Sequence, residues 1–391
     1  MNWTEFSTEL SDVDARAAAE YAGHGAESAE ALADETAPER VDIVIRDVGS
    51  AVPRAASIMA ELFGLPIEAV VAAVYRAPAR LVAGLEPQLA RKLVSCLTDL
   101  GLSLDIVPQG DPIAPTPTLD LAAEIDDPAL VDAATAVIAE FLAIPTDDAL
   151  DLLTTPPGII LGNVSRATID ALERRLPAGA LILSTADPTE SRYALFAGDL
   201  APADRAAVEA VLDAPSAAAG DGLVALGLTH SDANRLWRRF AGVPGVRLVN
   251  QAFLRFEMVL TDVSDSNAAT AQALEALAGI PAEAFADLAE LLPVAVEDGI
   301  PHEGVEARLL DYAAHGMTVT ARLANFARQV LVVDTAPPEA LEILGVDAAA
   351  LPLRLPPLVA PRARLARHRL EAAGADVSQF PAGEFAAGDW A

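Results

Sequence analysis

Two stretches of this sequence, 215 positions apart, share one pattern: GLPIEAVVAAVYRAPARLVAGL from Gly64 to Leu85, and GIPAEAFADLAELLPVAVEDGI from Gly279 to Ile300. They align without a gap, with glycine, proline, a Glu-Ala pair, a second proline and a second glycine at the same steps. The match continues outward, because VDIVIRDVG (41–49) aligns with FEMVLTDVS (256–264) and Gly101 aligns with Gly316. Internal repetition over roughly 65 residues is stronger evidence for the fold than any single motif, because it specifies how the whole chain is organised.

Each copy has the same predicted elements. A β run ends in aspartate, a helix follows, and a glycine that suits a helix C-cap precedes a proline that suits the first turn of a second helix. That second helix ends before Pro78 or Pro293, since proline interrupts a helix interior. A strand, a third helix and a last strand complete the order β-α-α-β-α-β.

A third full copy lies between these two, offset by 79 residues from the first. Asp126 ends its first strand, Pro145 opens its second helix and Pro157 closes that helix. Two shorter segments, beginning at RYALFAGDL and QVLVVDT, keep the strands and the last helix but have one helix where the full copies have two.

We therefore predict an α+β protein of tandem β-α-α-β-α-β units, three full and two shortened, each a small sheet with helices packed on one face. An uncovered edge strand invites pairing, so neighbouring units are candidates for sharing sheet edges. The predicted organisation is an acidic N-terminal tail (1–40), full units at 41–110, 118–188 and 253–325, shortened units at 191–252 and 327–382, and a C-terminal tail (383–391).

The full unit resembles the C-terminal domain of the bacterial ribosomal stalk protein, which shares a superfamily with the Clp protease adaptor. The residues that carry the resemblance are Gly64-Leu65, Glu68-Ala69, Pro78, Gly84 and Gly101 in the first unit, Gly279-Ile280, Glu283-Ala284, Pro293, Gly299 and Gly316 in the third full unit, and Gly374-Ala375 in the last short one. These are turn and packing residues, so the resemblance implies a fold and a bacterial source. It does not carry over the family's binding residues, because Ile67 and Val70 stand where the stalk domain uses lysines.

Composition limits the possible partners. The formal net charge is −31, from 26 basic and 57 acidic residues, and a surface this negative repels nucleic acid and anionic lipid. Lys92 is the only lysine, which we ascribe to a GC-rich genome or to adaptation to salt. Cys96 is the only cysteine, and no long uncharged apolar run is present, so we expect a cytoplasmic protein with no membrane insertion.

No motif predicts catalysis, a cofactor or a metal. The five histidines are scattered, Cys96 lies mid-helix where a buried thiol is expected, and DVSDSN (262–267) is interpreted as the start of a helix rather than as a calcium loop. The strand-end aspartates are predicted to cap the helices that follow, with ligand binding as the alternative. They are Asp47, Asp126, Asp262 and Asp334.

Arginines and tail aromatics are the candidate interaction residues. The last helices of the two short units carry basic faces, for which we consider two roles: pairing with acidic surfaces of neighbouring units, or docking an anionic partner. The aromatic residues of the tails are predicted either to bind a partner or to dock on the protein's own body. The candidates are Arg235, Trp237, Arg238, Arg239, Arg362, Arg364, Arg367 and Arg369 on the helices, and Trp3, Phe6, Phe385 and Trp390 in the tails.

The sequence therefore favours a non-enzymatic, protein-binding adaptor or scaffold whose partner and oligomeric state it does not specify. The alternative is an enzyme or small-molecule sensor with an anion-binding pocket between units, near the arginine-rich helices. An acidic decoy that mimics DNA is a third possibility.

Overall fold

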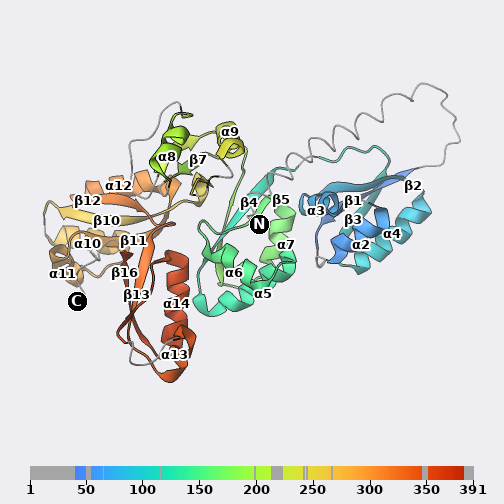
Figure 1. Ribbon diagram of the computed structural model, residues 1–391. Coiled ribbons are helices and arrows are strands. Elements are labelled where there is room, and N and C mark those ends of the chain that lie inside the picture. Colours follow the sequence, from blue (N-terminus) through green and yellow to red (C-terminus); the bar gives the residue numbers. More distant parts are fainter. Residues whose placement is uncertain are drawn as a thin grey trace. The chain divides into compact units, whose positions relative to one another are not determined.

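The computed structural model describes residues 40–49, 54–64, 66–114, 116–197, 200–212, 223–240, 243, 245–265, 267–345 and 351–382. It confirms an α+β fold made of small antiparallel sheets, each with its helices on one face (Figure 1). The chain divides into two compact units. The first holds the first repeat and most of the second, and the second holds the three remaining repeats together with Ala122–Ala129 and Leu152–Gly158.

The three full repeats follow the predicted order of elements. The first consists of β1 (Val41–Asp47), α2 (Arg54–Phe63), α3 (Ile67–Tyr75), β2 (Ala79–Leu85), α4 (Pro87–Asp99) and β3 (Ser103–Pro108). The second consists of β4 (Thr118–Ile125), η1 (Pro128–Leu130), α5 (Val131–Leu142), α6 (Thr146–Thr154), β5 (Ile159–Ser165), α7 (Arg166–Glu173) and β6 (Leu181–Ala186). The fourth consists of β10 (Arg255–Val263), α10 (Ala268–Ala278), η3 (Ala282–Ala284), α11 (Phe285–Glu290), β11 (Val294–Pro301), η4 (His302–Gly304), α12 (Val305–Ala314) and β12 (Met317–Leu323).

The two short repeats have one helix between their first strands. The third repeat consists of β7 (Tyr193–Phe196), α8 (Pro202–Glu209), β8 (Leu223–Leu228), α9 (His230–Phe240) and β9 (Arg247–Asn250), and η2 (Gln251–Phe253) leads out of it. The fifth consists of β13 (Arg328–Thr335), α13 (Pro338–Leu344), β14 (Leu353–Arg354), β15 (Leu358–Val359), α14 (Ala360–Ala372) and β16 (Asp376–Pro381).

Every sheet has its first strand in the centre. The orders are β2-β1-β3, β5-β4-β6, β8-β7-β9 and β11-β10-β12, and in the fifth repeat β14, β15 and β16 all pair with β13. Among the described strands, each pairing joins two strands of the same repeat. The expectation that neighbouring units share sheet edges is therefore wrong, because the helix and final strand of each repeat return the chain to its own central strand.

The second strand contains the same irregularity in several repeats. Between Val41↔Leu85 and Ile43↔Val82, β2 carries one more residue than β1, and the same shift occurs where β8 pairs with β7 and where β11 pairs with β10. A residue with positive φ lies at this step: Gly84 (φ 70°), Gly227 (φ 73°) and Gly299 (φ 76°). Glycine takes this conformation at little cost, so these repeated glycines encode a β-bulge.

The turn between the first two helices explains the opening motif. Gly64 (φ 63°) and Gly279 (φ 69°) are left-handed, and Ala143 (φ 55°) takes the same conformation in the second repeat. Pro66 is the N-cap residue of α3 and so stands one position before the first turn that we predicted. The prolines before the second strand are all in cis linkage, at Ala77-Pro78, Pro156-Pro157, Leu292-Pro293 and Leu351-Pro352.

The strand-end aspartates do not cap the next helix as predicted. Asp47 accepts a hydrogen bond of 2.8 Å from the backbone N–H of Gly49 and closes a turn at the strand end instead. In the fourth repeat the cap of α10 is Asn267, which accepts from Ala269 and Thr270, while Asp262 is exposed within β10. The prediction placed the caps too early, because loop residues separate the strand from its helix: four lie between β10 and α10, and two lie between β13 and α13. Of the stretch 262–267, which we interpreted as the start of a helix, Asn267 caps α10 as expected, whereas Asp262 and Val263 still belong to β10.

Cores form separately within the repeats. In the fourth repeat Met258, Leu260 and Tyr312 are fully buried and Phe285 packs with them, and in the third Leu195, Leu236 and Phe240 form the core. Burial of such side chains supplies roughly 1.5–3 kcal/mol each, so each repeat has its own source of stability.

Candidate functional site

Helix α9 presents three arginines on one side. Arg235, Arg238 and Arg239 are exposed, whereas Leu236 and Phe240 are buried against the sheet of the third repeat. Positions three and four apart lie on the same face of a helix, so the three guanidinium groups share the solvent side. This arrangement agrees with the basic face predicted for RLWRRF.

The start of α9 keeps one carboxylate beside this face. The hydroxyl of Thr229 donates a hydrogen bond of 2.6 Å to Asp232, and the backbone N–H of Asp232 donates one of 3.2 Å to that hydroxyl. The hydrogen bond from Thr229 lowers the pKa of Asp232, and the charges of Arg235 and Arg192 lower it further. Arg235 pairs with Asp232 at 3.1 Å, so Asp232 offsets only part of the positive charge on the helix.

Trp237 lies outside the arginine face. It is half-buried, and helical spacing places it about 100° around α9 from Arg238 and about 160° from Arg235 and Arg239. The guanidinium of Arg239 lies 5.5 Å from the centroid of the buried Phe240 ring. The exposed face is therefore formed by the three arginines alone.

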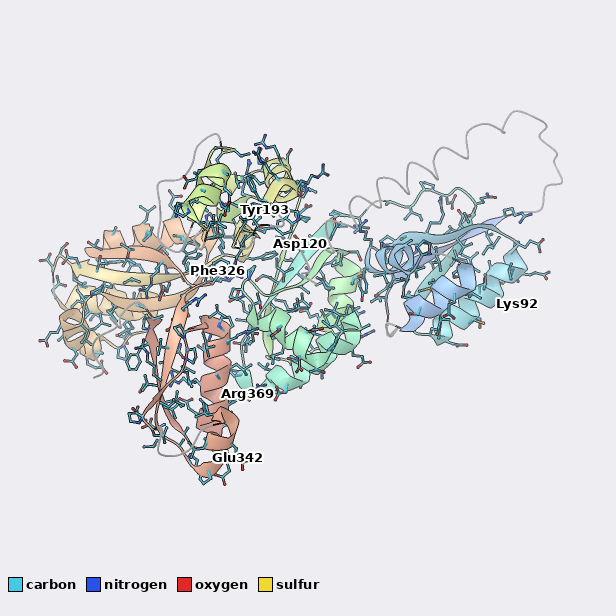
Figure 2. The ribbon with its side chains drawn as sticks, viewed as in Figure 1. Lys92, Asp120, Tyr193, Phe326, Glu342 and Arg369 are labelled. Atoms are coloured by element: carbon cyan, nitrogen blue, oxygen red, sulfur yellow. The ribbon has the colours of Figure 1, made fainter. Side chains whose placement is uncertain are left out.

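Helix α14 does not form a single basic face. By helical spacing, Arg364 and Arg367 lie on one side, while Arg362 and Arg369, seven residues apart, lie on another. Arg367 pairs with Glu371 of the same helix at 2.7 Å, and Arg362 donates a hydrogen bond of 3.2 Å to the hydroxyl of Thr154. Figure 2 labels Arg369 on this helix. Only α9 thus keeps its predicted arginines together.

The aromatic residues of the tails, Trp3, Phe6, Phe385 and Trp390, lie outside the described residues. Their predicted roles stay predictions.

A contact that the sequence did not reveal joins the first and second repeats. Tyr75, at the end of α3, stacks on Phe141 with 5.9 Å between ring centroids and 3° between planes. The Tyr75 hydroxyl donates a hydrogen bond of 2.9 Å to the backbone oxygen of Phe141. Burial raises the pKa of Tyr75 to about 12, and the charge of Arg175 opposes part of that shift.

Arg175 completes this contact. Its guanidinium lies 5.0 Å from the centroid of the Phe141 ring and donates a hydrogen bond of 2.8 Å to the backbone oxygen of Gly49. Thr168 adds a hydrogen bond of 2.8 Å to the backbone oxygen of Tyr75. The end of α3 therefore docks into the second repeat through stacking, a cation and two backbone acceptors.

A different surface joins the third and fourth repeats. Ala194, Phe196 and Val249 of the third repeat are buried with Leu254 and Leu323 of the fourth. Phe196 meets Phe326 edge-on, with 5.0 Å between centroids, and Figure 2 labels Phe326 at this position. The side chains of both inter-repeat contacts fit the ordinary apolar pattern of their helices and strands. A single sequence therefore gives no sign that they make these contacts.

The fourth repeat also holds a partly buried charged cluster. Glu297 on β11 accepts a 2.8 Å hydrogen bond from Arg308 and a 2.9 Å hydrogen bond from the hydroxyl of Tyr312, both of which lie on α12. Burial and the hydrogen bond to Glu297 raise the pKa of Tyr312, and the bond to Glu297 raises the pKa of Arg308. Because Arg308 also donates to the backbone oxygen of Leu277, the cluster ties together three elements of one core.

In the part of the chain that the structure describes, no group of three or more histidine, cysteine, aspartate or glutamate side chains is arranged to hold a metal ion. Cys96 is exposed, so the prediction of a buried thiol is wrong. The buried residue of that turn of α4 is Leu97, one position further on, and successive helical residues point about 100° apart.

Among the described residues, no single helix combines the length and the apolar character needed to cross a membrane. The bent pair Pro128–Leu142 and Thr146–Thr154, with 112° between its halves, meets that requirement by length and composition.

Comparison with models of known protein families, with curated proteins and with solved structures found no match to this chain. The resemblance to the ribosomal stalk domain therefore remains a prediction based on turn and packing residues.

Proposed function

We propose that this protein is a non-enzymatic adaptor or scaffold of the cytoplasm whose repeats bind other proteins, and that the arginine face of α9 contacts an acidic partner. The single observation that carries this proposal is the face itself: Arg235, Arg238 and Arg239 are exposed together on one side of a helix.

The distribution of charge along the chain supports this assignment. The second and fourth repeats each contain twelve acidic residues against three arginines, whereas the third contains six of each. On a chain with a net charge of −31, three arginines on one face form a local exception that draws an acidic partner and orients it.

The chemistry of arginine favours a protein partner. A guanidinium group is planar and binds carboxylates with two parallel hydrogen bonds, and it also stacks on aromatic rings. Arginine is among the side chains most enriched where binding energy concentrates in protein interfaces, and the face contains three of them.

The repeats also bind protein surfaces within this chain. The first and second repeats meet through Tyr75 and Phe141, and the third and fourth meet through Phe196 and Phe326. The same small fold therefore offers different surfaces to different neighbours, which suits a scaffold.

The test is affinity purification of the tagged full chain from its host. The variant reverses the face (Arg235→Glu, Arg238→Glu, Arg239→Glu), and the control makes the same charge change at exposed or half-buried arginines elsewhere (Arg46→Glu, Arg166→Glu, Arg205→Glu). We expect a stoichiometric acidic protein with the wild type and the control but not with the variant.

Two other outcomes discriminate between the candidates. A partner that the variant retains would remove α9 from the proposal. Absence of any protein, together with a thermal shift by phosphate or citrate that the variant loses, would favour the small-molecule sensor instead.

A further inference from the structure

The second helices of the three full repeats end at corresponding residues. With the offsets of 79 and 215 residues, Tyr75 at the end of α3 corresponds to Thr154 at the end of α6 and to Glu290 at the end of α11. These helix ends are therefore the same surface in three copies of one fold, and their surroundings can be compared directly.

In the first and second repeats, the last helix of another repeat contacts this surface. Thr168 on α7 of the second repeat donates a hydrogen bond of 2.8 Å to the backbone oxygen of Tyr75, and the charge of Arg175, just after that helix, acts on the Tyr75 phenol. Thr154 is 2% exposed and accepts a hydrogen bond of 3.2 Å from Arg362 on α14 of the fifth repeat. In both cases an arginine on or next to the last helix takes part in the contact.

In the fourth repeat the same surface is open. Asp287 and Glu290 of α11 are exposed, and the next residue, Leu291, is 69% exposed, more than any other large apolar side chain among the described residues. Within the described part of the chain, no hydrogen bond or ion pair engages the carboxylates of Asp287 and Glu290. We call Asp287, Glu290 and Leu291 the α11 end.

The arginine face of α9 matches the α11 end in charge and spacing. Helix α9 is the last helix of the third repeat, as α7 and α14 are of theirs. Arg235 and Arg238 are three residues apart, as are Asp287 and Glu290, so the members of each pair lie about 4.5 Å apart along the helix axis. Two guanidinium groups can therefore meet two carboxylates at once, and the methylene groups of the arginines can cover Leu291.

Within one chain, α9 faces away from the fourth repeat. Successive residues of a strand point to opposite faces of a sheet. Ala194 and Phe196 of β7 pack against the fourth repeat, whereas Leu195 between them belongs to the core that contains Leu236 of α9. The α11 end that receives α9 is therefore that of a second copy.

We propose that α9 of one copy docks on the α11 end of a second copy of this chain. This inference rests on the proposed role of α9 in binding an acidic surface, and it identifies that surface as part of the chain itself. The contact joins two different surfaces, and each copy offers one of each. Copies therefore assemble into a closed ring or an open chain.

Sedimentation velocity of the full chain over a range of concentrations tests the proposal. We expect the wild type to self-associate, and to do so more weakly at high salt because exposed charges are screened. Charge reversal of either surface should raise the dissociation constant at least about tenfold, because like charges then face each other. The variants are Arg235→Glu/Arg238→Glu on α9 and Asp287→Arg/Glu290→Arg on α11.

A matched control separates this contact from the effect of net charge. Glu303→Arg/Glu306→Arg makes the same change in charge at two exposed positions of the same repeat, at the far end of β11 from Leu291. The control should associate like the wild type. The α11 variant is less negative overall, which by itself favours association, so a loss of association there comes from the lost contact.

Mixing the two charge-reversed variants in equal amounts should restore association, because each reversed surface then meets its complement, and recovery also shows that both variants are folded. A wild type that stays monomeric at every concentration would overturn the inference, as would association that the α11 variant retains. A partner from the host lysate that is lost with the α9 variant but kept with the α11 variant would contradict this inference alone and leave the proposed function standing.

Discussion

The hydroxyl of Tyr75 lies 2.9 Å from the backbone oxygen of Phe141, and the two rings stack in parallel, so one side chain joins the first repeat to the second by two interactions. Phe141 lies in the last turn of α5, where carbonyl groups have no partner within the helix. Tyr75 therefore supplies a hydrogen-bond donor that α5 itself does not provide.

Replacing Tyr75 with phenylalanine should separate the two interactions. The ring and its stacking remain, but a largely buried carbonyl loses its donor, which costs about 1–2 kcal/mol. Denaturant unfolding measures this loss of stability. Hydrogen exchange of the folded variant should show faster exchange in α3 and α5, with no change in the repeats of the second compact unit. Equal exchange in the wild type and the variant would mean that water replaces the hydroxyl.

The phenol of Tyr75 should lose its proton at a higher pH than an unperturbed tyrosine. The pKa of Tyr75 is about 12 in the folded chain against 10.0 for an unperturbed phenol, and burial also raises the pKa of Tyr312. Because the folded state holds these protons more tightly, their contribution to stability is complete below pH 10. The part due to Tyr75 is lost as the pH rises through about 12, and the part due to Tyr312 is also lost as the pH rises above 10. Phenolate absorbance measures this directly, and Tyr75→Phe and Tyr312→Phe should each remove one late-titrating group. With one lysine and one cysteine in the chain, few other groups titrate in that range.

The sequence predicted the order of elements because turn residues recur with the repeat. Gly64 and Gly279 take the left-handed conformation that ends a helix, and Gly84 and Gly299 take the one that a bulge requires. Such residues report local backbone geometry, which a single sequence encodes directly.

Contacts between repeats were not predictable in this way. Tyr75 and Phe141 are ordinary apolar positions of two helices, and only the packing of one repeat on another makes them partners. The exposure of Cys96 was not predicted, because the spacing of apolar residues shows which side of a helix is buried but not where the buried side ends. The α9 arginine face could be predicted because its residues are close together in the sequence and lie on one helix, so that helical spacing alone places them on one side. Its role in binding stays a prediction.

The bulge allows a test at aligned positions. Gly84 (φ 70°) in the first repeat corresponds to Asn163 (φ 58°) in the second. A Cβ atom at Gly84 would meet only the end of the Gln109 side chain at 3.4 Å, so the cost of substitution comes from the backbone. Gly84→Ala should therefore destabilise the first repeat by about 1–2 kcal/mol, and Gly84→Asn by less, because asparagine tolerates this conformation better.

Thermal unfolding of both Gly84 variants measures this difference. The matched control is Gly304→Ala, since Gly304 has φ −88° and an added Cβ would have ordinary contacts. That control should be neutral or slightly stabilising. Equal losses for alanine and asparagine at position 84 would show that space, rather than φ, sets the cost.

The stability of the partly buried cluster in the fourth repeat should depend on the charge of Glu297. Glu297→Gln keeps the shape of the side chain but replaces one acceptor oxygen with a donor NH2 group that faces Arg308 and Tyr312. Hydrogen bonds to charged groups are worth about 1.5–3 kcal/mol each, so we expect a loss of about 2–3 kcal/mol in the free energy of unfolding of this repeat. The control is Glu290→Gln on α11, an exposed position expected to change stability by less than about 0.5 kcal/mol.

The pKa of Tyr312 provides a second readout, because Glu297 helps to raise it: the phenol should titrate at lower pH in Glu297→Gln. A loss of stability without that shift would mean that the variant disturbs packing rather than the charge that Glu297 supplies.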